Sequence, residues 1–328
     1  MILKILKTNL SLLLILSLLC GCGADTDEKI SDAILKANQY LSTSKCQKAI
    51  DVLEAVGRQV SNKSYLITLA SGYACRGKFS ELTLFTTDIT KVGTPSIMGS
   101  FSTFSSAADM TSITDSDFTD VNIAIKILAY AGGISAGATG VNPTSAMRQL
   151  SFGASGSGDI DAMILYLTMA NLGRWIRFYG APDASGNQTQ CVLNYNGVYT
   201  LDSSATLEAT LALLAGTCTT AATAGSSDIG NSGSYVTSNI CDGIVLLNTF
   251  FDVLPNVLDN YTGGELDSVN AVRTGLETKA GLLTAAKTGS EDILETTNHE
   301  KCVAENADEE FMQWFFVFMI EPLYISSP

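Results

Sequence analysis

Histidine is almost absent from this sequence, which contains only His299 among its 328 residues. Catalysis of the Ser-His-Asp or Cys-His type needs a histidine poised near neutral pH. His299 stands in a polar stretch, where we expect a solvent-exposed loop, and no His-Glu-x-x-His motif occurs. Hydrolysis by a carboxylate pair stays open, because 33 acidic residues offer many accidental pairs. We predict no catalytic residues, and a hydrolase is the least favoured function.

Basic residues are also scarce. The chain has 19 Lys and Arg against 33 Asp and Glu, a formal net charge of −14. Such a surface repels nucleic acid and anionic lipid headgroups, so neither is expected as a partner. Although only 16% of the residues are charged, 46% are hydrophobic, which predicts a folded chain rather than a disordered one.

Two strongly apolar segments, Leu10–Leu19 and Phe311–Ile320, are each too short to span a bilayer, which takes about 20 apolar residues. The second is interpreted as a buried closing helix. The first follows Lys4 and Lys7, and lysines before a short apolar run are typical of an export signal. An N-terminal membrane helix is the less favoured alternative.

The residues after the first apolar run, Leu19-Cys20-Gly21-Cys22, resemble the lipobox of bacterial lipoproteins. In that family a small residue precedes the cysteine that is diacylated and becomes the new N-terminus. Gly21 fits the position of the small residue, so the resemblance implies a fatty-acid anchor on Cys22. It also implies a signal peptide over residues 1–21 and a tether over residues 22–28.

The resemblance further implies a location in the cell envelope. Gly23 and Ala24 follow the cysteine, without the Asp that retains enteric lipoproteins in the inner membrane. We therefore expect an outer-membrane anchor, with the protein facing the periplasm. Cleavage would remove Lys4 and Lys7, leaving 19 − 2 = 17 basic against 33 acidic residues and a charge of −16. The lipid would then hold the protein without help from a basic patch.

Six further cysteines predict disulfides, because their number is even and an exported chain meets an oxidising compartment. They are Cys46, Cys75, Cys191, Cys218, Cys241 and Cys302. A zinc site is the alternative, but it needs closely spaced Cys or His pairs that are missing here. We expect no metal and no cofactor.

The pairing of these cysteines follows partly from helix geometry. Cys46 lies 15 residues before a turn near Ser61 and Cys75 lies 14 residues after it, so the two are neighbours in an antiparallel helix pair. The remaining four cysteines allow three connectivities. We prefer Cys191–Cys218 and Cys241–Cys302.

Helical periodicity is clearest over residues 29–86, in four segments; Asn62 is expected to begin the third and Gly77 to end it. These segments resemble two tetratricopeptide-type hairpins, with a Tyr40-to-Tyr73 spacing of 33 residues against a family period of about 34. The residues that carry the resemblance in the second hairpin are Leu69, Ala70, Tyr73, Gly77 and Phe79. Ser44 stands where the first hairpin would have its turn glycine. A generic antiparallel helical bundle is the alternative.

Residues 87–116 are rich in Ser and Thr and are predicted to form a linker or a long loop. A larger helical body is expected over 117–328, with a loop-rich insertion at 181–204. Its helices are expected from about Val121, from Asp159 to about Tyr179, at about 205–215, at 242–261, at about 265–286 and at about 309–320. The predicted fold class is thus all-α: hairpins followed by a helical bundle, stapled by disulfides.

Two motifs inside this body are not interpreted as ligand sites. The glycine-rich runs Gly132–Gly140 and Gly153–Gly158 lack the order and the lysine of nucleotide-binding loops, so flexible loops between helices are expected. Asp115, Asp117 and Asp120 fail the EF-hand pattern, and helix capping by Asp117 and Asp120 is the preferred interpretation.

One small-molecule site is considered. Trp175, with neighbouring aromatic residues, is a candidate lining for an apolar pocket in which Arg174 and Arg177 receive an anionic group. Core packing, with the two arginines reaching towards solvent, is the preferred alternative.

Helical hairpins present concave surfaces to peptides and proteins. The favoured function is therefore a non-catalytic adaptor or assembly factor that binds an unknown envelope protein. A small-molecule-binding component of a periplasmic uptake system is the second hypothesis.

Overall fold

The computed structural model describes residues 26–93, 95–107, 112, 114–193, 230–231, 234–260, 277–278, 280–285, 291–305, 312 and 314–325. Within these residues the regular structure is helical apart from one two-residue hairpin, which confirms the all-α class. The elements are α2 (Thr26–Leu41), α3 (Cys46–Glu54), α4 (Lys63–Arg76), α5 (Glu81–Thr83), η1 (Leu84–Asp88), η2 (Ile89–Lys91), α6 (Ile97–Ser102), α7 (Ser116–Ala129), α8 (Ser145–Tyr179), β1 (Gly230–Asn231), β2 (Ser234–Tyr235), α11 (Thr237–Asn260), α13 (Glu291–Leu294), α14 (His299–Glu305), η5 (Phe316–Ile320) and α16 (Glu321–Ile325).

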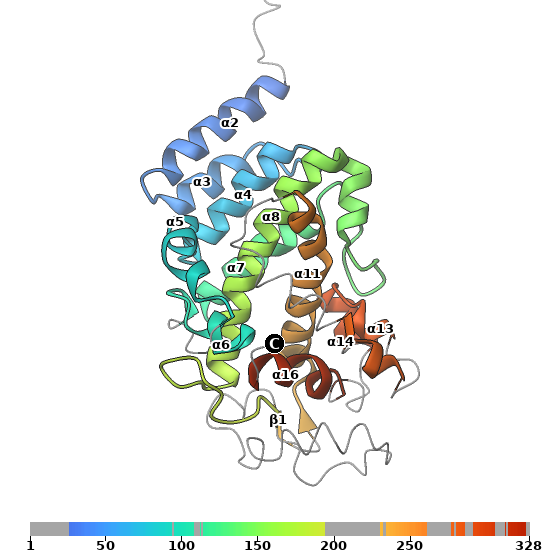
Figure 1. Ribbon diagram of the computed structural model, residues 1–328. Helices are drawn as coiled ribbons and strands as arrows, with labels where there is room; N and C mark the ends of the chain where they lie inside the picture. Colours follow the sequence, from blue (N-terminus) through green and yellow to red (C-terminus); the bar gives the residue numbers. More distant parts are fainter. Residues whose placement is uncertain are drawn as a thin grey trace, which may run out of the picture.

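The N-terminal helices α2, α3 and α4 stack at one end of the molecule, and the C-terminal α16 lies towards the other (Figure 1). The four helical segments expected over 29–86 are present, the fourth broken into α5 and the short η1 and η2 turns. The Asn62 side chain accepts a hydrogen bond from the Tyr65 N–H at 3.0 Å, as expected of the residue that begins α4. The Cys46–Cys75 disulfide is confirmed, with the two Cα atoms 5.6 Å apart. The tetratricopeptide resemblance itself stays a prediction.

In two turns of these hairpins the left-handed conformation falls on residues other than glycine, whereas the turn between α3 and α4 has it at Gly57. Ser44 has φ +54°, as the position of a turn glycine requires. At the end of α4 the left-handed residue is Lys78 rather than Gly77, whose φ is −76°. Gly77 is needed for space instead, because a Cβ atom there would lie 2.8 Å from the Asp117 carbonyl oxygen.

The expectation of a linker or loop over 87–116 is wrong for its central part. Ile97–Ser102 forms α6, all of whose residues are buried. The helix packs on α8 so closely that a Cβ atom on Gly173 would clash with the Phe101 carbonyl oxygen. The Ser96 hydroxyl also donates to the Tyr324 carbonyl oxygen at 2.6 Å. Small Ser and Gly residues here permit close helix packing, whereas their abundance was interpreted as a sign of a loop.

The expectation of a loop at Gly153–Gly158 is also wrong. These residues lie inside α8, which bends at Gly153, where φ is +71°. The two segments of the bent helix are tied together by a buried ion pair between Arg148 Nε and Asp161 Oδ1, 2.6 Å apart. The other glycine-rich run, Gly132–Gly140, does contain no helix or strand, as predicted.

The long helices α8 and α11 form the centre of the body, side by side in Figure 1. Among the described helices, α11 alone is long and apolar enough to cross a membrane, but 67% of its apolar window is buried inside the protein. Core packing on α8 accounts for that apolar sequence. The predicted Cys241–Cys302 disulfide is confirmed and ties α11 to α14.

This disulfide also corrects the expectation for His299. The residue begins α14, and its side chain is only 18% exposed because the bridge holds α14 against α11. Cys191 is disulfide-bonded as well. Its predicted partner Cys218, the predicted anchor Cys22 and the helix expected at about 205–215 lie outside the described residues.

The C-terminal segment closes the core, as predicted. The five residues of η5 are buried, and the side chain of Glu321, which follows them, is fully buried too. Its carboxylate accepts hydrogen bonds from the Gln188 side chain and from the Val192 backbone N–H, each at 2.8 Å. The described part of the 181–204 insertion is thereby fastened to α16.

Candidate functional site

An open groove runs along α4, between the α5–η1 segment and the part of α8 that follows the bend. We call it the α4–α8 groove. It consists of two adjoining hollows of about 700 Å³ and 470 Å³, which share Glu81 and Met163 in their linings. In Figure 1, α4 crosses the upper end of the long segment of α8.

Four of the α8 residues that line the larger hollow are small, namely Ala154, Ser155, Gly158 and Ala162, and the others are Asp159, Met163 and Tyr166. The small residues follow one face of the helix, so the wall is low at these positions, and another chain can approach the α8 backbone closely there. The bend at Gly153 directs this face towards α4.

The opposite wall is apolar and partly exposed. Ile67 of α4 lies in it, with Phe85 of η1, whose side chain is 43% exposed. The Phe85 ring packs edge-on against Tyr166 of α8, with the ring centroids 4.8 Å apart. Leu82, one turn before Phe85, is 73% exposed. Exposed apolar side chains beside a groove are typical of binding surfaces.

The charges at the groove are mainly acidic. Glu81 is exposed at the point where the two hollows meet. Asp159 lines the other side, and Lys63 pairs with it at 2.5 Å. Lys78 lies in the smaller hollow, where its ammonium is bound to Asp117 at 2.8 Å. Glu81 therefore supplies a negative charge to the groove.

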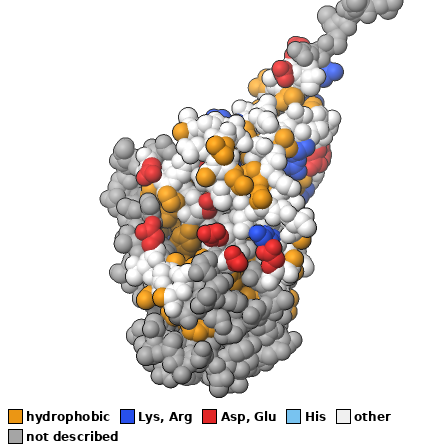
Figure 2. Space-filling model, turned by 90° about the vertical axis from the view of Figure 1, so that its right-hand side faces the viewer, with side chains coloured by type: hydrophobic (Ala, Val, Ile, Leu, Met, Phe, Trp, Pro, Cys, Tyr) orange, Lys and Arg blue, Asp and Glu red, His pale blue; other side chains and the backbone are white. Residues whose placement is uncertain are grey.

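Figure 2 shows a face of the molecule on which hydrophobic side chains appear at several places, with acidic side chains between them. This mixture agrees with the acidic composition of the chain. It fits partners that combine apolar and basic groups.

The smaller hollow adjoins the N-terminal disulfide. Cys46 and Cys75 both line it, together with Ala74 and Phe79. The bridge fixes the spacing of α3 and α4 at this point, so the groove is present before any partner binds.

The residues predicted to form a ligand pocket are structural instead. Arg174 is fully buried, and its guanidinium donates to the carbonyl oxygens of Gly77 and Asp117, both at 2.6 Å. It thus joins the end of α4, where orphan carbonyl groups need donors, to the start of α7. Trp175 is buried against α11 and donates to the Asn239 carbonyl oxygen at 3.2 Å. Arg177 lies at the surface, and none of the three lines the groove.

The aspartates interpreted as helix caps have a different role. The N-cap of α7 is Asp115, whose side chain accepts from the Asp117 N–H. Asp117 binds Lys78, and Asp120 binds Arg76 at 2.6 Å. These ion pairs join the N-terminal hairpins to the body. Among the described residues, no group of His, Cys, Asp and Glu is arranged to hold a metal ion.

No family model, curated protein or solved structure matches this chain.

Sequence reasoning missed the groove, although signals for it were present. Ala154, Gly158 and Ala162 recur every four residues, which is the pattern of one small-residue face on a helix. The glycines were interpreted as loop formers, which concealed that pattern. Likewise, the apolar spacing of Leu82 and Phe85 predicts a helix face but does not reveal that this face is left exposed.

Proposed function

We propose that this protein is a lipid-anchored lipoprotein of the cell envelope that acts without catalysis, as an adaptor. Its α4–α8 groove would bind a segment of another envelope protein that carries apolar side chains and at least one basic residue. The observation that carries the proposal is the groove itself, open and lined by the helices of the N-terminal hairpins.

Both the shape and the charge of the groove support a peptide segment as the occupant. The low wall at Ala154 and Gly158 accepts the backbone of a second chain. Phe85 and Tyr166 offer rings to its apolar side chains, and aromatic residues supply much of the energy at such interfaces. Glu81 and the net charge of −14 favour a basic residue beside them.

The proposed lipid anchor on Cys22 would determine how far the groove lies from the membrane. From Cys22 to Thr26 the extended chain reaches about 14 Å at most. With Cys22 acylated, the N-terminal hairpins would lie close to the membrane surface, where segments of other envelope proteins are within reach.

Photocrosslinking in living cells tests the groove. A photoreactive amino acid replaces Ser155, which is exposed and lines the groove. The matched control replaces Leu150, which lies on the same helix before the bend and is 89% exposed. We expect a discrete protein adduct from position 155 that position 150 does not give.

Charge reversal then tests the chemistry. Glu81→Lys is expected to abolish the adduct, whereas Glu28→Lys, an equal charge change on the exposed side of α2, leaves it in place. The crosslinked peptide, identified by mass spectrometry, should contain Lys or Arg next to apolar residues. An adduct that survives Glu81→Lys, or an acidic crosslinked peptide, contradicts the proposal.

The anchor is tested separately by labelling with a radioactive fatty acid. We expect the wild-type chain to incorporate the label and Cys22→Ser to lose it. A Cys22→Ser variant labelled as heavily as wild type would place the anchor elsewhere and remove the argument for location, while leaving the groove result intact.

A further inference from the structure

A second, separate cavity lies between α7, α11 and the first residue of α14. We call it the α7–α11 pocket, and its volume is about 280 Å³. Its walls are mainly apolar, formed by Phe118, Ile123 and Ile125 of α7 with Val245 and Leu246 of α11. Pockets of this kind, apolar with a few polar groups, are typical of small-molecule sites.

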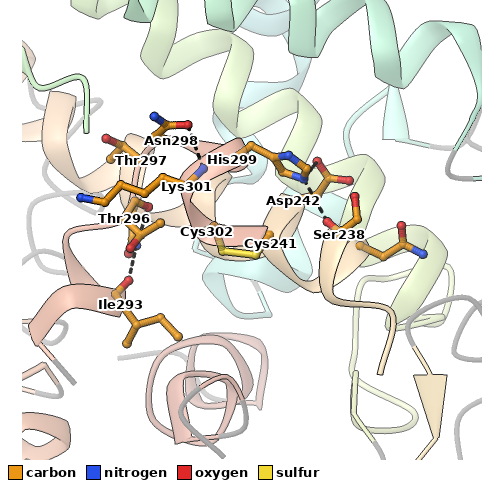
Figure 3. Close-up of a disulfide and its surroundings, with 12 residues drawn as sticks. Ser238, Cys241, Asp242, Ile293, Thr296, Thr297, Asn298, His299, Lys301 and Cys302 are labelled. Atoms are coloured by element: carbon orange, nitrogen blue, oxygen red, sulfur yellow. Dashed lines mark hydrogen bonds and ion pairs between the residues drawn. A yellow bond between two sulfur atoms is a disulfide. The ribbon is translucent and has the colours of Figure 1, made fainter. Parts of the chain in front are cut away.

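One carboxylate stands in this apolar surrounding. Asp242 lines the pocket, and its side chain is only 19% exposed. Its nearest titratable neighbour is His299, drawn beside it in Figure 3, and Nε2 lies 3.3 Å from Oδ1. The same Nε2 lies 3.0 Å from the Ser238 carbonyl oxygen, which can only accept, so the ring donates its hydrogen bond there. Among the described residues no other group donates to the Asp242 carboxylate.

The other charged groups around Asp242 do not neutralise its negative charge. Lys126 of α7 faces the pocket, but its ammonium is bound to Glu300 at 2.9 Å. Burial raises the pKa of Asp242 to about 6, and the charges of His299 and Lys126 offset this only in part. A buried carboxylate with so few donors is unfavourable unless a further cation or donor reaches it.

We propose that the α7–α11 pocket binds a small amine, whose apolar part fills the pocket and whose ammonium group pairs with Asp242. An anionic ligand would meet the Asp242 carboxylate, and the one ammonium group in the described lining, on Lys126, is already bound to Glu300. A purely apolar ligand would take water from Asp242 without replacing it. This site is independent of the α4–α8 groove, with which its lining shares no residue.

The Cys241–Cys302 disulfide preorganises the α7–α11 pocket. Cys241 precedes Asp242, and its bridge to Cys302 fixes α14, with His299, against α11 (Figure 3). A preformed pocket costs little ordering on binding. The bridge therefore has a role at the site as well as in stability.

Isothermal titration of the full chain in detergent tests the proposal with three probes of similar shape. These are 3-phenylpropylamine, 3-phenylpropan-1-ol and 3-phenylpropanoate. At about pH 7.5 we expect the amine to bind at least about tenfold more tightly than the other two, the usual gain from a hydrogen bond to a charged group. At about pH 5 this preference should disappear, because Asp242 is then mostly protonated.

Variants show whether the amine binds in the pocket or is attracted non-specifically to the acidic surface of the protein. Asp242→Asn should remove the preference for the amine, whereas Asp259→Asn, an exposed carboxylate on the same helix, should leave it unchanged. Ile123→Trp is placed at the rim, where the side chain is 37% exposed, and should block all three probes without disturbing the core. Equal binding of amine and carboxylate, or amine binding that Asp242→Asn leaves unchanged, overturns the proposal, as does the absence of any amine binding to the wild-type chain.

Discussion

The boundary between the N-terminal hairpins, residues 26–91, and the helical body holds an ion pair of a different kind from the one inside the body. The Lys63–Asp159 pair, which joins the two regions at the surface, has side chains 36% and 59% exposed. In the body, Arg148 and Asp161 are both fully buried. A charge of a surface pair that loses its partner is solvated by water at little cost, whereas a buried charge that loses its partner is not. The boundary beside the groove thus tolerates change at this pair, whereas the pair inside the body constrains the packing around the bend of α8.

The largest effect is therefore expected at Asp161. Its carboxylate accepts hydrogen bonds from Arg148, from the Ser145 hydroxyl and from the Asn256 amide. Asp161→Ala removes the acceptor of three donors and should lower the free energy of unfolding by about 3–5 kcal/mol. Urea unfolding followed by circular dichroism measures the loss.

The surface pair provides the control. Lys63→Met breaks the pair with Asp159 and should change stability by about 0–1 kcal/mol. Adding Arg148→Met and Asp252→Asn to Asp161→Ala should recover part of the loss, because the buried positive charge and the charge of its second partner, Asp252, are then removed as well. Equal costs for Asp161→Ala and Lys63→Met would refute the contrast between the two regions.

The two described disulfides extend the comparison. Cys46–Cys75 closes a separation of 29 residues within the hairpins, and Cys241–Cys302 closes one of 61 residues in the body. Because the entropy removed from the unfolded chain grows with loop length, we expect losses of about 3.5 and about 4 kcal/mol when each pair is replaced by serine. Thermal unfolding of the two double variants measures both. A larger loss for the hairpin pair would show that loop entropy does not set the order.

Unlike Asp161, which forms an ion pair with Arg148, Asp242 forms no ion pair with an arginine among the described residues. Its pKa is raised by burial to about 6, above that of the unfolded chain. The stability that this shift contributes is present below about pH 4 and is lost as the pH rises through about 6. Asp242→Asn resembles the protonated form, so it should stabilise the protein by roughly 1–3 kcal/mol at pH 7 and by almost nothing near pH 4. Unfolding curves at several pH values measure this, and a gain that does not depend on pH would contradict it.

Helix positions were largely predictable from the sequence, because apolar periodicity and caps act locally. Asn62 begins α4 as its side chain requires, and α11 (Thr237–Asn260) corresponds to the helix expected at 242–261. The Cys46–Cys75 bond followed from the same local geometry, since both cysteines are equidistant from one turn.

The site was less predictable, because it depends on which surfaces meet in the fold. Glycine and serine are ambiguous in sequence. They form loops at Gly132–Gly140, but at Gly173 and Gly158 they permit close packing or a low wall. Arg174 and Trp175 resemble pocket residues in composition, but the carbonyl oxygens that bind them come from segments distant in the sequence. Similarly, the disulfide brings His299 beside Asp242 from 57 residues away, which periodicity does not reveal.

The smallest effect is expected at the turn between α2 and α3, where the hairpins retain a local strain. Ser44 has φ +54°, a conformation that costs residues with a Cβ atom roughly 1 kcal/mol or more relative to glycine. Ser44→Gly relieves this cost but makes the unfolded chain more flexible, so a net gain of about 0.5–1 kcal/mol is expected. Ser42→Gly, in the same turn, has no such strain to relieve and also removes a hydrogen bond to the Gln39 carbonyl oxygen, so it should lower stability. Opposite signs for the two variants in urea unfolding would identify backbone conformation as the cause. If both variants changed the free energy of unfolding in the same direction, the turn would not store strain at Ser44. The backbone of the hairpins would then be more adaptable than the Cys46–Cys75 disulfide suggests.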